Sequence, residues 1–437
     1  MTRAIVLCPR LKHQPAIRPD ERRVEEAVGL ARAIDLEVID TRAVVLSRVR
    51  PSHLLGSGLI EELTPLIAEQ KVTLLIIDSV VSPVQQRNLE KDLNVKVLDR
   101  TGLILEIFGR RARTHEGKLQ VELAALSYQR GRLVRSWTHL ERQRGGFGFL
   151  GGPGESQIEM DRRLLDTRME RIKKDLADVR RTRGLHRQRR TDVPYPLVAL
   201  VGYTNAGKST LFNRLSGAEV MAKDMLFATL DPTVRAVKLG NGQTVMLSDT
   251  VGFIADLPTQ LIEAFKATLE EVLAADIILH VRDISHPETD TQKDSVLSVL
   301  RDIGLTDEEL KERVIEVWNK IDCLLPQPIT PPPGVVAVSA LTGAGMPALL
   351  DVLTQRHQAD WLLYTVHIPH GDGAARAWLA AHGEVVGTEG EEVQVRLEAP
   401  AAARFQKRFT GSTLTLLDHP PLPTLNKPST TPPHQHP

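Results

Sequence analysis

The sequence predicts a multidomain α/β protein, and three observations carry that prediction. Residues 1–114 alternate short apolar segments with helical patterns, which is typical of an α/β domain with a parallel sheet. Residues 115–190 carry apolar side chains at heptad spacing, which indicates an antiparallel helical hairpin. A glycine-rich loop between an apolar segment and a helical pattern indicates a P-loop domain at 191–358, with a mostly parallel sheet and helices on both faces. A small α+β domain at 359–418 and a disordered Pro/Thr-rich tail at 419–437 complete the predicted chain.

Composition limits the class of protein. The chain has 437 residues, of which 42% are apolar, so about three or four packed domains are expected. Its two cysteines, Cys8 and Cys323, argue against a disulfide framework. No apolar segment is long enough to span a membrane, and the first ten residues lack a signal-peptide pattern. We therefore expect a cytoplasmic protein, and a monomer because nothing in the sequence demands self-association.

The N-terminal domain is expected to alternate strands with helices. Short apolar segments predict strands at 4–7, 36–40, 73–78 and 95–98. Amphipathic patterns between them predict helices at 21–34, 59–69 and 83–93. The last helix has the clearest start, because Ser82 is a favoured N-cap and Pro83 a favoured first helical residue.

The hairpin is predicted from two heptad series. Each arm should be about 35–40 Å long at about 1.5 Å per residue. Gly131 lies inside the first arm, and an interruption there is one alternative, because glycine weakens a helix. Residues 115–190 hold 18 Lys and Arg against 10 Asp and Glu in a chain that is neutral overall, which indicates a local surface for nucleic acid. The first series is Leu119, Leu126, Leu133 and Leu140, and the second is Ile158, Leu165, Ile172 and Val179.

The P-loop domain should begin with a buried strand at 197–201 and a helix that starts near Lys208. Asn241-Gly242 predicts a hairpin turn between strands at 233–239 and 244–247. Further strands are expected at 277–281, 314–318 and 335–338, with a proline-rich surface loop at 326–333. Beyond about residue 360, the order strand, helix, strand, strand, helix is expected.

The glycine-rich loop carries the most specific chemistry in the chain. It fits the pattern G-x-x-x-x-G-K-[ST], whose backbone N–H groups wrap phosphate oxygens at a helix N-terminus. Lys208 should reach the β- and γ-phosphates, and the Ser209 hydroxyl should ligate Mg²⁺. The predicted phosphate-binding residues are Gly202, Tyr203, Thr204, Asn205, Ala206, Gly207, Lys208, Ser209 and Thr210.

Two further motifs follow in the order that a nucleotide site requires. In the first, Asp249-Thr250-Val251-Gly252, the Asp249 carboxylate is expected to hold Mg²⁺ through water, and the Gly252 N–H is expected to contact the γ-phosphate. In the second, Asp322 can accept hydrogen bonds from the N1–H and exocyclic amine of guanine, an arrangement that adenine does not offer. Together the motifs predict a GTP site that includes Asp249, Thr250, Val251 and Gly252, then Asn319, Lys320, Ile321 and Asp322, then Ser339, Ala340 and Leu341.

Long segments of the chain resemble the HflX family of ribosome-associated GTPases. They include "LDRTGLILEIFGRRARTHEGKLQVELAALSYQRGRL", "GGPGESQIEMDRR", "MLFATLDPTVR" and "DTVGFIADLPTQLIEAFKATLEEVLAAD". The resemblance implies that Thr229 is the switch threonine that ligates Mg²⁺ when GTP is bound. With it, Lys208, Thr229 and Gly252 become the expected catalytic residues, Ser209, Thr229 and Asp249 the expected magnesium ligands, and Phe227, Ala228, Leu230 and Asp231 part of the nucleotide site.

Two positions depart from or extend the standard site. Phe253 stands where many related GTPases carry a water-orienting glutamine, so slow intrinsic hydrolysis and stimulation by a large ribosomal subunit are expected. Asn205 has two interpretations. In similar GTPases this asparagine ligates K⁺ beside the phosphates, whereas the alternative is an amide that only stabilises the turn. Hydrolysis rates in potassium and sodium buffers distinguish them.

The segment between the hairpin arms places aromatic side chains among glycines and arginines. Rings can stack on unpaired bases while guanidiniums contact phosphates, so this tip is a candidate RNA-binding element. The alternative is a small local core formed by the two phenylalanines. The resemblance to HflX favours RNA, because the family inserts this region near the peptidyl-transferase centre. The predicted RNA contacts are Arg142, Arg144, Phe147, Phe149, Arg162 and Arg163.

The function expected from these observations is a GTPase that binds the large ribosomal subunit and its rRNA and dissociates stalled ribosomes in its GTP state. Two alternatives remain. A GTP-gated assembly factor for the large subunit would use the same site and surface. An added ATP-driven RNA-remodelling activity would lie in the N-terminal domain, near Gly56 and Gly58, although that domain lacks a second phosphate-binding motif.

Overall fold

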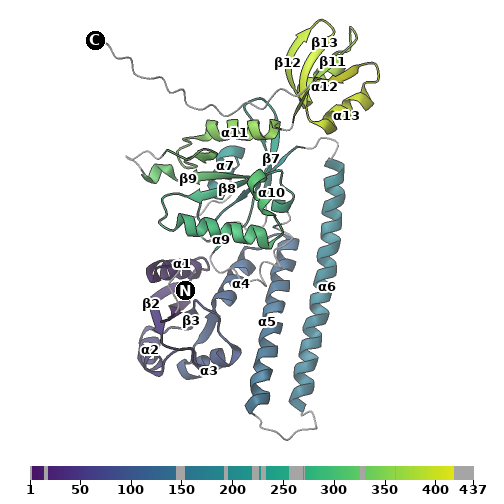
Figure 1. Ribbon diagram of the computed structural model, residues 1–437. Helices are drawn as coiled ribbons and strands as arrows, with labels where there is room; N and C mark the ends of the chain where they lie inside the picture. Colours follow the sequence, from purple (N-terminus) through teal and green to yellow (C-terminus); the bar gives the residue numbers. More distant parts are fainter. Residues whose placement is uncertain are drawn as a thin grey trace, which may run out of the picture. The chain divides into compact units, whose positions relative to one another are not determined.

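The predicted multidomain α/β class is confirmed by the computed structural model (Figure 1). The structure describes residues 2–13, 18–143, 153–190, 195–218, 226–227, 233–254, 269, 271–324, 330–359 and 361–417. The chain divides into two compact units, Met1–Val237 with Val245–Met346, and Lys238–Thr244 with Pro347–Pro437. The finer domain boundaries expected from the sequence stay predictions, and the tail beyond residue 417 lies outside the described residues.

The N-terminal domain contains a parallel four-stranded sheet in the order β2-β1-β3-β4. The predicted strands and helices are all present; α3 has its predicted bounds, and the others have shifted ends. Strands β1 and β2 extend beyond their predicted ends because they pair along their length, from Arg3 opposite Glu37 to Leu11 opposite Leu46. The elements are β1 (Arg3–Leu11), α1 (Asp20–Arg32), β2 (Glu37–Leu46), α2 (Ser57–Gln70), β3 (Leu74–Ile77), α3 (Pro83–Leu93), β4 (Lys96–Asp99) and α4 (Arg100–Arg111).

Helices cover both faces of this sheet. Alternate residues of β1 and β3 point to opposite sides, so Val6 and Ile76 join one core and Leu7 and Ile77 join the other. Helices α1 and α4 pack on the first core, while α2 and α3 pack on the second. The predicted start of α3 is confirmed, because the Ser82 side chain forms a capping box with Gln85. The sheet is therefore doubly wound.

Helix α4 was not expected as a separate helix. Its N-cap is Asp99, the last residue of β4, whose side chain accepts a hydrogen bond from Gly102 N at 2.8 Å. The chain passes from strand to helix with no intervening loop, so no turn signal marks the boundary. Buried Ile104 and Phe108 then hold α4 on the sheet.

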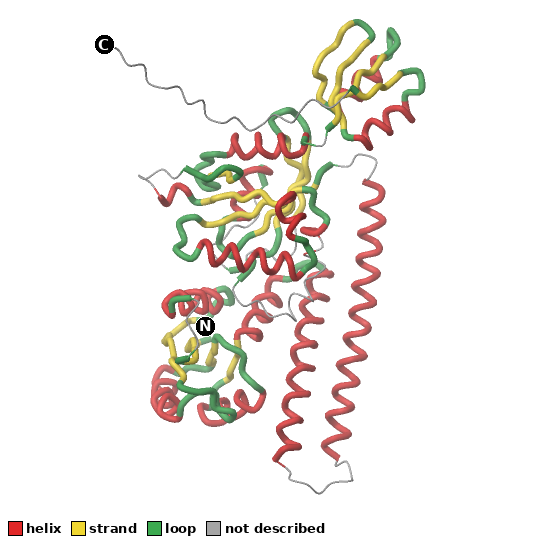
Figure 2. Tube along the Cα trace, viewed as in Figure 1, coloured by secondary structure: helices red, strands yellow, loops and turns green. Residues whose placement is uncertain are grey.

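The helical hairpin consists of α5 (His115–Gln143) and α6 (Pro153–Arg190), which run side by side (Figure 2). The heptad prediction is confirmed at Leu119 and Ile172, which share one buried cluster with Leu176. Helix α5 continues through Gly131 without interruption. The helices contain 29 and 38 residues, so they are about 43 and 57 Å long and exceed the predicted arm length.

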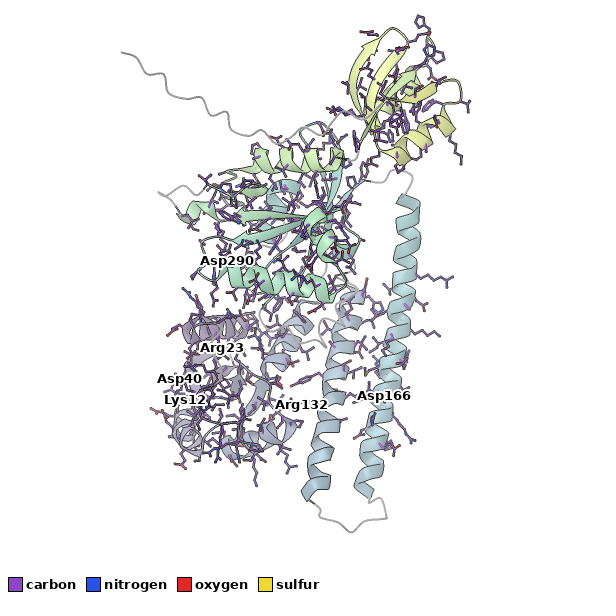
Figure 3. All side chains as sticks on the ribbon, viewed as in Figure 1. Lys12, Arg23, Asp40, Arg132, Asp166 and Asp290 are labelled. Atoms are coloured by element: carbon purple, nitrogen blue, oxygen red, sulfur yellow. The ribbon has the colours of Figure 1, made fainter. Side chains whose placement is uncertain are left out.

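Ion pairs supplement this apolar contact. Arg130 Nε on α5 lies 3.0 Å from an oxygen of Asp166 on α6, a residue labelled in Figure 3. The opposite side of α5 packs on the N-terminal domain, where the Tyr128 hydroxyl donates to Asp99 Oδ1 at 2.7 Å. Arg132, also labelled in Figure 3, donates to the Val81 carbonyl oxygen at 3.0 Å. The hairpin is thereby anchored to the N-terminal sheet through α5.

The next domain holds a six-stranded sheet in the order β10-β9-β8-β5-β7-β6. The pairings of β5 with β7 and β8, of β8 with β9 and of β9 with β10 are parallel, as predicted. Gly242, with φ of 82°, lies in the predicted turn between β6 and β7. The elements are β5 (Leu197–Val201), α7 (Lys208–Ser216), β6 (Thr233–Lys238), β7 (Thr244–Asp249), β8 (Ile277–Asp283), α9 (Thr289–Asp302), α10 (Asp307–Arg313), β9 (Val314–Asn319), the 3-10 helix Ile321–Leu324, β10 (Val335–Ala337) and α11 (Met346–Gln358).

The C-terminal region forms an antiparallel sheet in the order β12-β13-β11-β14, the arrangement of a split βαβ fold. Helices α12 and α13 pack on one face through Trp378 and Phe405. The predicted order of elements is confirmed except for β14, a short and largely exposed edge strand. The elements are β11 (Leu362–His367), α12 (Gly373–His382), β12 (Glu384–Glu389), β13 (Glu392–Leu397), α13 (Ala399–Arg408) and β14 (Thr413–Leu416). Within the described ranges, no helix is long and apolar enough to cross a membrane.

A buried histidine gives the P-loop domain a testable pH dependence. His280, on the central strand β8, is 2% exposed, and its burial lowers its pKa to about 3. The positive charges of Arg282 and Lys293 lower this pKa further, whereas the Glu316 carboxylate opposes the shift. The unfolded chain protonates below about pH 6.5, whereas the folded protein does not, so the free energy of unfolding falls as the pH decreases. Relative to a His280→Leu variant, wild type should lose about 2 kcal/mol between pH 7 and pH 5, measured by urea unfolding. If the difference in free energy of unfolding between wild type and His280→Leu is the same at pH 7 and pH 5, the lowered pKa of His280 is contradicted.

Candidate functional site

The phosphate loop joins the end of β5 to the start of α7, as the sequence predicted. Gly202 has φ of +153°, and a Cβ there would lie 2.2 Å from the carbonyl oxygen of Val281. Gly207 has φ of +92°, and its Cβ would lie 2.2 Å from Asn319 Nδ2. Neither position admits a larger residue, because the backbone conformation and the neighbouring atoms both require glycine.

Lys208 is the first residue of α7, and its side chain folds back over the loop. Its ammonium donates hydrogen bonds to the carbonyl oxygens of Gly202 at 3.0 Å and Tyr203 at 2.9 Å. Burial lowers the pKa of Lys208 to about 8, although the nearby Asp249 carboxylate opposes this shift. The cation therefore lies at the N-terminus of a helix, where an anion is already favoured.

Ser209 and Asp249, two of the predicted magnesium ligands, lie within hydrogen-bond distance of each other. The Ser209 hydroxyl donates to Asp249 Oδ2 at 2.8 Å, which joins the first turn of α7 to the end of β7. Asp249 is fully buried. A hydroxyl and a carboxylate are hard oxygen donors of the kind that Mg²⁺ prefers, so the residues present fit that ion.

The segment after β7 is fixed against the phosphate loop. Thr204 N donates to the Phe253 carbonyl at 2.7 Å, and Phe253 N donates to the Gly202 carbonyl at 3.1 Å. Gly252 immediately precedes Phe253, whose N–H and carbonyl make both bonds. A Cβ at Gly252 would lie 2.8 Å from Thr204 Cγ2 and 3.0 Å from Lys208 Nζ, so only glycine allows this approach.

The Phe253 ring lies in the core of the domain. It is 3% exposed and packs in one cluster with Val201 of β5, Ile278 of β8 and Val296 of α9. Neither its position nor its chemistry suits it to orient a water molecule at the phosphates. Water positioning for hydrolysis must therefore come from another group.

Asn319 connects the two halves of the predicted site. Its Nδ2 donates to the Ala206 carbonyl of the phosphate loop at 2.8 Å, while its Oδ1 accepts from Ala340 N at 3.0 Å. Both partners come from loops distant in sequence. These two bonds allow the buried amide of Asn319 to brace the phosphate loop against the loop after β10.

Asp322 lies beside the loop that follows β10. Its Oδ1 accepts a hydrogen bond from the Ser339 hydroxyl at 2.5 Å, which fixes the carboxylate. Lys320 has φ of 64°, and its ammonium pairs with Asp283 Oδ2 at 2.7 Å. Asp322, Ser339 and Ala340, all residues of the predicted GTP site, therefore lie together, with Leu341 71% exposed next to Ala340.

Comparison with known proteins agrees with this geometry. Residues 21–109 match a family model described as GTP-binding GTPase N-terminal, residues 111–190 one described as GTP-binding GTPase Middle Region, and residues 197–320 one described as 50S ribosome-binding GTPase. A GTPase HflX of Magnetococcus marinus is 51% identical over 386 residues, which cover 87% of this chain and 88% of that protein. The chain belongs to the HflX family of GTPases.

Two further relatives agree. A GTPase HflX of Escherichia coli is 43% identical over 364 residues, covering 82% of this chain and 84% of that protein. One from Lacrimispora saccharolytica is 48% identical over 334 residues, covering 76% and 77%. The family, the P-loop motif and the geometry agree that this chain is an enzyme that hydrolyses GTP to GDP and phosphate.

Arg214 is a residue of this HflX site that the sequence did not indicate. From the last turn of α7, it donates through Nε to the Ala340 carbonyl at 3.2 Å and through its terminal nitrogen to the Leu341 carbonyl. These bonds hold the base-side loop against the helix that begins at the phosphate loop. No local pattern predicts them, because the partners lie more than 120 residues away.

Several predicted residues of the HflX site fall outside the described part of the chain. These are Ala228, Thr229, Leu230 and Asp231. Phe227 is described, and its side chain lies 2% exposed in the N-terminal core, where its ring meets Phe108 edge-on with centroids 4.7 Å apart. Asn205 is exposed, with φ of 60°, a conformation that asparagine tolerates. This geometry agrees with both interpretations of Asn205.

The predicted RNA contacts are only partly described. Arg144, Phe147 and Phe149 lie outside the described residues, as does the side chain of Arg142. Arg163 is 77% exposed on α6 and pairs with Glu159 at 2.6 Å, while Arg162 lies 4.0 Å from Asp166. These acidic neighbours reduce the local positive charge. In the N-terminal domain, Gly56 caps α2, and a Cβ at Gly56 or Gly58 would meet no atom within 4 Å.

Proposed function

We propose that this GTPase binds the large ribosomal subunit and, in its GTP-bound state, dissociates stalled ribosomes. Hydrolysis is stimulated by the ribosome and used for release. The match of 197–320 to a model described as 50S ribosome-binding GTPase supports the partner. The observation that carries the proposal is the position of Phe253, since a site whose own side chain cannot orient water depends on a partner.

In the proposed mechanism, the chain's own groups neutralise and orient the triphosphate. Lys208 contacts the β- and γ-phosphates, the Gly252 N–H donates to the γ-phosphate, and Asp322 selects guanine. Ser209, Thr229 and Asp249 would hold Mg²⁺, which supplies charge neutralisation at the phosphates. Binding of Thr229 to Mg²⁺ and contact of the Gly252 N–H with the γ-phosphate would order the loops around these two residues only in the GTP state. We further propose that Asn205 ligates K⁺. Equal GTP hydrolysis rates in potassium and sodium buffers would contradict this role.

The hairpin is proposed as the ribosome-binding element. Its apolar seam and its attachment to the N-terminal domain through Tyr128 and Arg132 give α5 a fixed base. Because α5 is held on the N-terminal domain, the hairpin can position its predicted RNA-binding residues. A variant with Phe147→Ala and Phe149→Ala should lose ribosome binding and splitting but retain GTP affinity.

Purified large subunits should raise the kcat for GTP hydrolysis by about 100-fold or more. This is the effect expected when a partner supplies a catalytic group that the enzyme lacks. The stimulation is measured as the rate of phosphate release by the protein alone, with small subunits and with large subunits. Equal turnover in all three conditions would refute ribosome stimulation.

The alternative proposal is a GTP-gated assembly factor for the large subunit. Subunit dissociation with a non-hydrolysable GTP analogue would show that binding alone separates ribosomes, but it would not distinguish rescue from assembly. Sucrose gradients with stalled ribosomes and with precursor particles do so, because a rescue factor splits the former and an assembly factor associates with the latter. ATP hydrolysis that survives Lys208→Ala would instead support an ATP-driven activity in the N-terminal domain.

A further inference from the structure

Tyr203 belongs to the phosphate loop, but its side chain lies in the N-terminal domain. It is 7% exposed and shares a buried cluster with Ala27 and Leu30 of α1. Its hydroxyl donates a hydrogen bond to Glu26, also on α1. One residue of the nucleotide site is therefore held by a different domain within the first compact unit.

Glu26 is the centre of a buried charge cluster, formed with Arg18, Arg100 and Asp78, which we name the α1 charge cluster. Arg100 lies 2.5 Å from one Glu26 oxygen, and Arg18 lies 3.0 Å from the other. The opposite side of Arg100 meets Asp78 at 2.5 Å. Burial alone would raise the pKa of Glu26, but Arg100 and Arg18 outweigh it and hold the pKa below its usual value. Glu26 is thus a charged and fixed acceptor for the Tyr203 hydroxyl.

This cluster lies at the edge of the sheet where α/β domains commonly bind ligands. Asp78 follows β3 and Arg100 follows β4, so both stand at the carboxyl ends of parallel strands. The helices that follow β1 and β3 cover opposite faces, which makes this edge a topological switch point. Here the partner that reaches the cluster is the side chain of Tyr203.

The same cluster has a second link to the nucleotide-binding domain. Arg18 pairs with Glu288 at 2.9 Å, and Glu288 is the residue that precedes α9. The turn before Glu288 begins at Asp283, which forms the ion pair with Lys320 on the base side of the site. The α1 charge cluster therefore connects to both the phosphate side and the base side.

The backbone of Tyr203 is fixed by the nucleotide site itself. Its carbonyl accepts the hydrogen bond from Lys208, and it forms an isolated parallel bridge with Phe253. A movement of the Tyr203 side chain would thus displace the carbonyl that Lys208 contacts. A loop held in place before binding loses less entropy when ligand arrives, and so binds more tightly.

We propose that Tyr203 is a positioning residue through which the α1 charge cluster holds the phosphate loop in its nucleotide-binding geometry. The N-terminal domain then contributes to GTP and GDP affinity. This inference concerns the nucleotide site of the GTPase and is independent of the proposed action on ribosomes.

The test is a Tyr203→Phe variant of the full chain, which keeps the buried ring and removes only the hydroxyl. We expect the Kd for GDP and for GTP to rise about tenfold, the loss typical of a hydrogen bond to a buried carboxylate. The KM should rise in parallel, while kcat stays within about twofold, because the hydroxyl acts on binding and not on the reacting phosphate. Fluorescent nucleotide titration and steady-state hydrolysis measure these values without ribosomes.

The matched control is Tyr128→Phe, which removes another hydrogen bond from a partly buried tyrosine to a carboxylate, at Asp99. It should leave both Kd values unchanged. Glu26→Leu, which offers no acceptor to the Tyr203 hydroxyl, combined with Tyr203→Phe should weaken affinity no more than Glu26→Leu alone, because the two residues act through one bond. Nucleotide affinity that is unchanged in Tyr203→Phe, or reduced equally in both tyrosine variants, would overturn the proposal.

Discussion

Replacing Asp322 with asparagine should lower kcat/KM for GTP by about four orders of magnitude and raise it for xanthosine triphosphate. The carboxylate offers two acceptors to the N1–H and exocyclic amine of guanine. An asparagine would instead direct an N–H at that amine and leave buried donors unpaired, which is the costly form of mismatch. Xanthine carries a carbonyl in place of the amine, so the same N–H becomes a donor to it.

The geometry makes Asp322→Asn a clean substitution. The Ser339 hydroxyl that donates to Asp322 Oδ1 can donate to an amide oxygen in the same way, so the loop should keep its conformation. Asp302→Asn, on the exposed surface of α9, is the matched control and should leave both activities unchanged. Hydrolysis of GTP and xanthosine triphosphate is measured for each protein. An unchanged preference for GTP in Asp322→Asn would show that base selection lies elsewhere.

A Gly252→Ala variant should lose about 100- to 1,000-fold in kcat, the usual cost of misplacing one donor at a reacting phosphate. The added Cβ would stand 2.8 Å from Thr204 Cγ2, 3.0 Å from Lys208 Nζ and 3.1 Å from Thr204 Cα. Thr204 Cα is backbone of the phosphate loop and cannot shift cheaply. The Gly252 segment must therefore move away, and its N–H moves with it.

Single-turnover hydrolysis measures this loss, and nucleotide titration shows where it arises. The affinity for GDP should change by less than about threefold, because the displaced N–H is assigned to the γ-phosphate that GDP lacks. Gly240→Ala is the control, since a Cβ at Gly240 meets no atom within 4 Å. If Gly252→Ala lowers GDP and GTP affinity equally with an unchanged kcat, Gly252 is needed for the loop and not for the γ-phosphate.

Local patterns predicted the elements whose signals are local. The bounds of α3, β5 and the start of α7 agree with the prediction because a cap, an apolar run or a glycine loop marks each. Helix α4 and strand β14 were missed for the opposite reason. The N-cap of α4 is itself a strand residue, and β14 is short, largely exposed and paired with β11, a strand distant in sequence.

The residues of the candidate site also divide into those that a local motif predicts and those that only the folded chain reveals. Its motifs place Lys208, Asp249 and Asp322 in the sequence, and the structure brings their loops together around Asn319. Arg214 has no motif, because its role consists of bonds to a loop more than 120 residues away. Phe227 was expected at the nucleotide, yet its ring packs on Phe108, a contact that only the folded chain creates.

The sequence by itself determined the nucleotide, since the residue types that recognise phosphate and guanine occur at fixed short spacings. Only the tertiary structure decided how the N-terminal domain takes part. The hydrogen bond from Tyr203 to Glu26 joins residues 177 positions apart, and neither residue type is unusual in its own segment. Such a contact depends on how two cores pack, and packing follows from three-dimensional complementarity that a one-dimensional pattern does not encode.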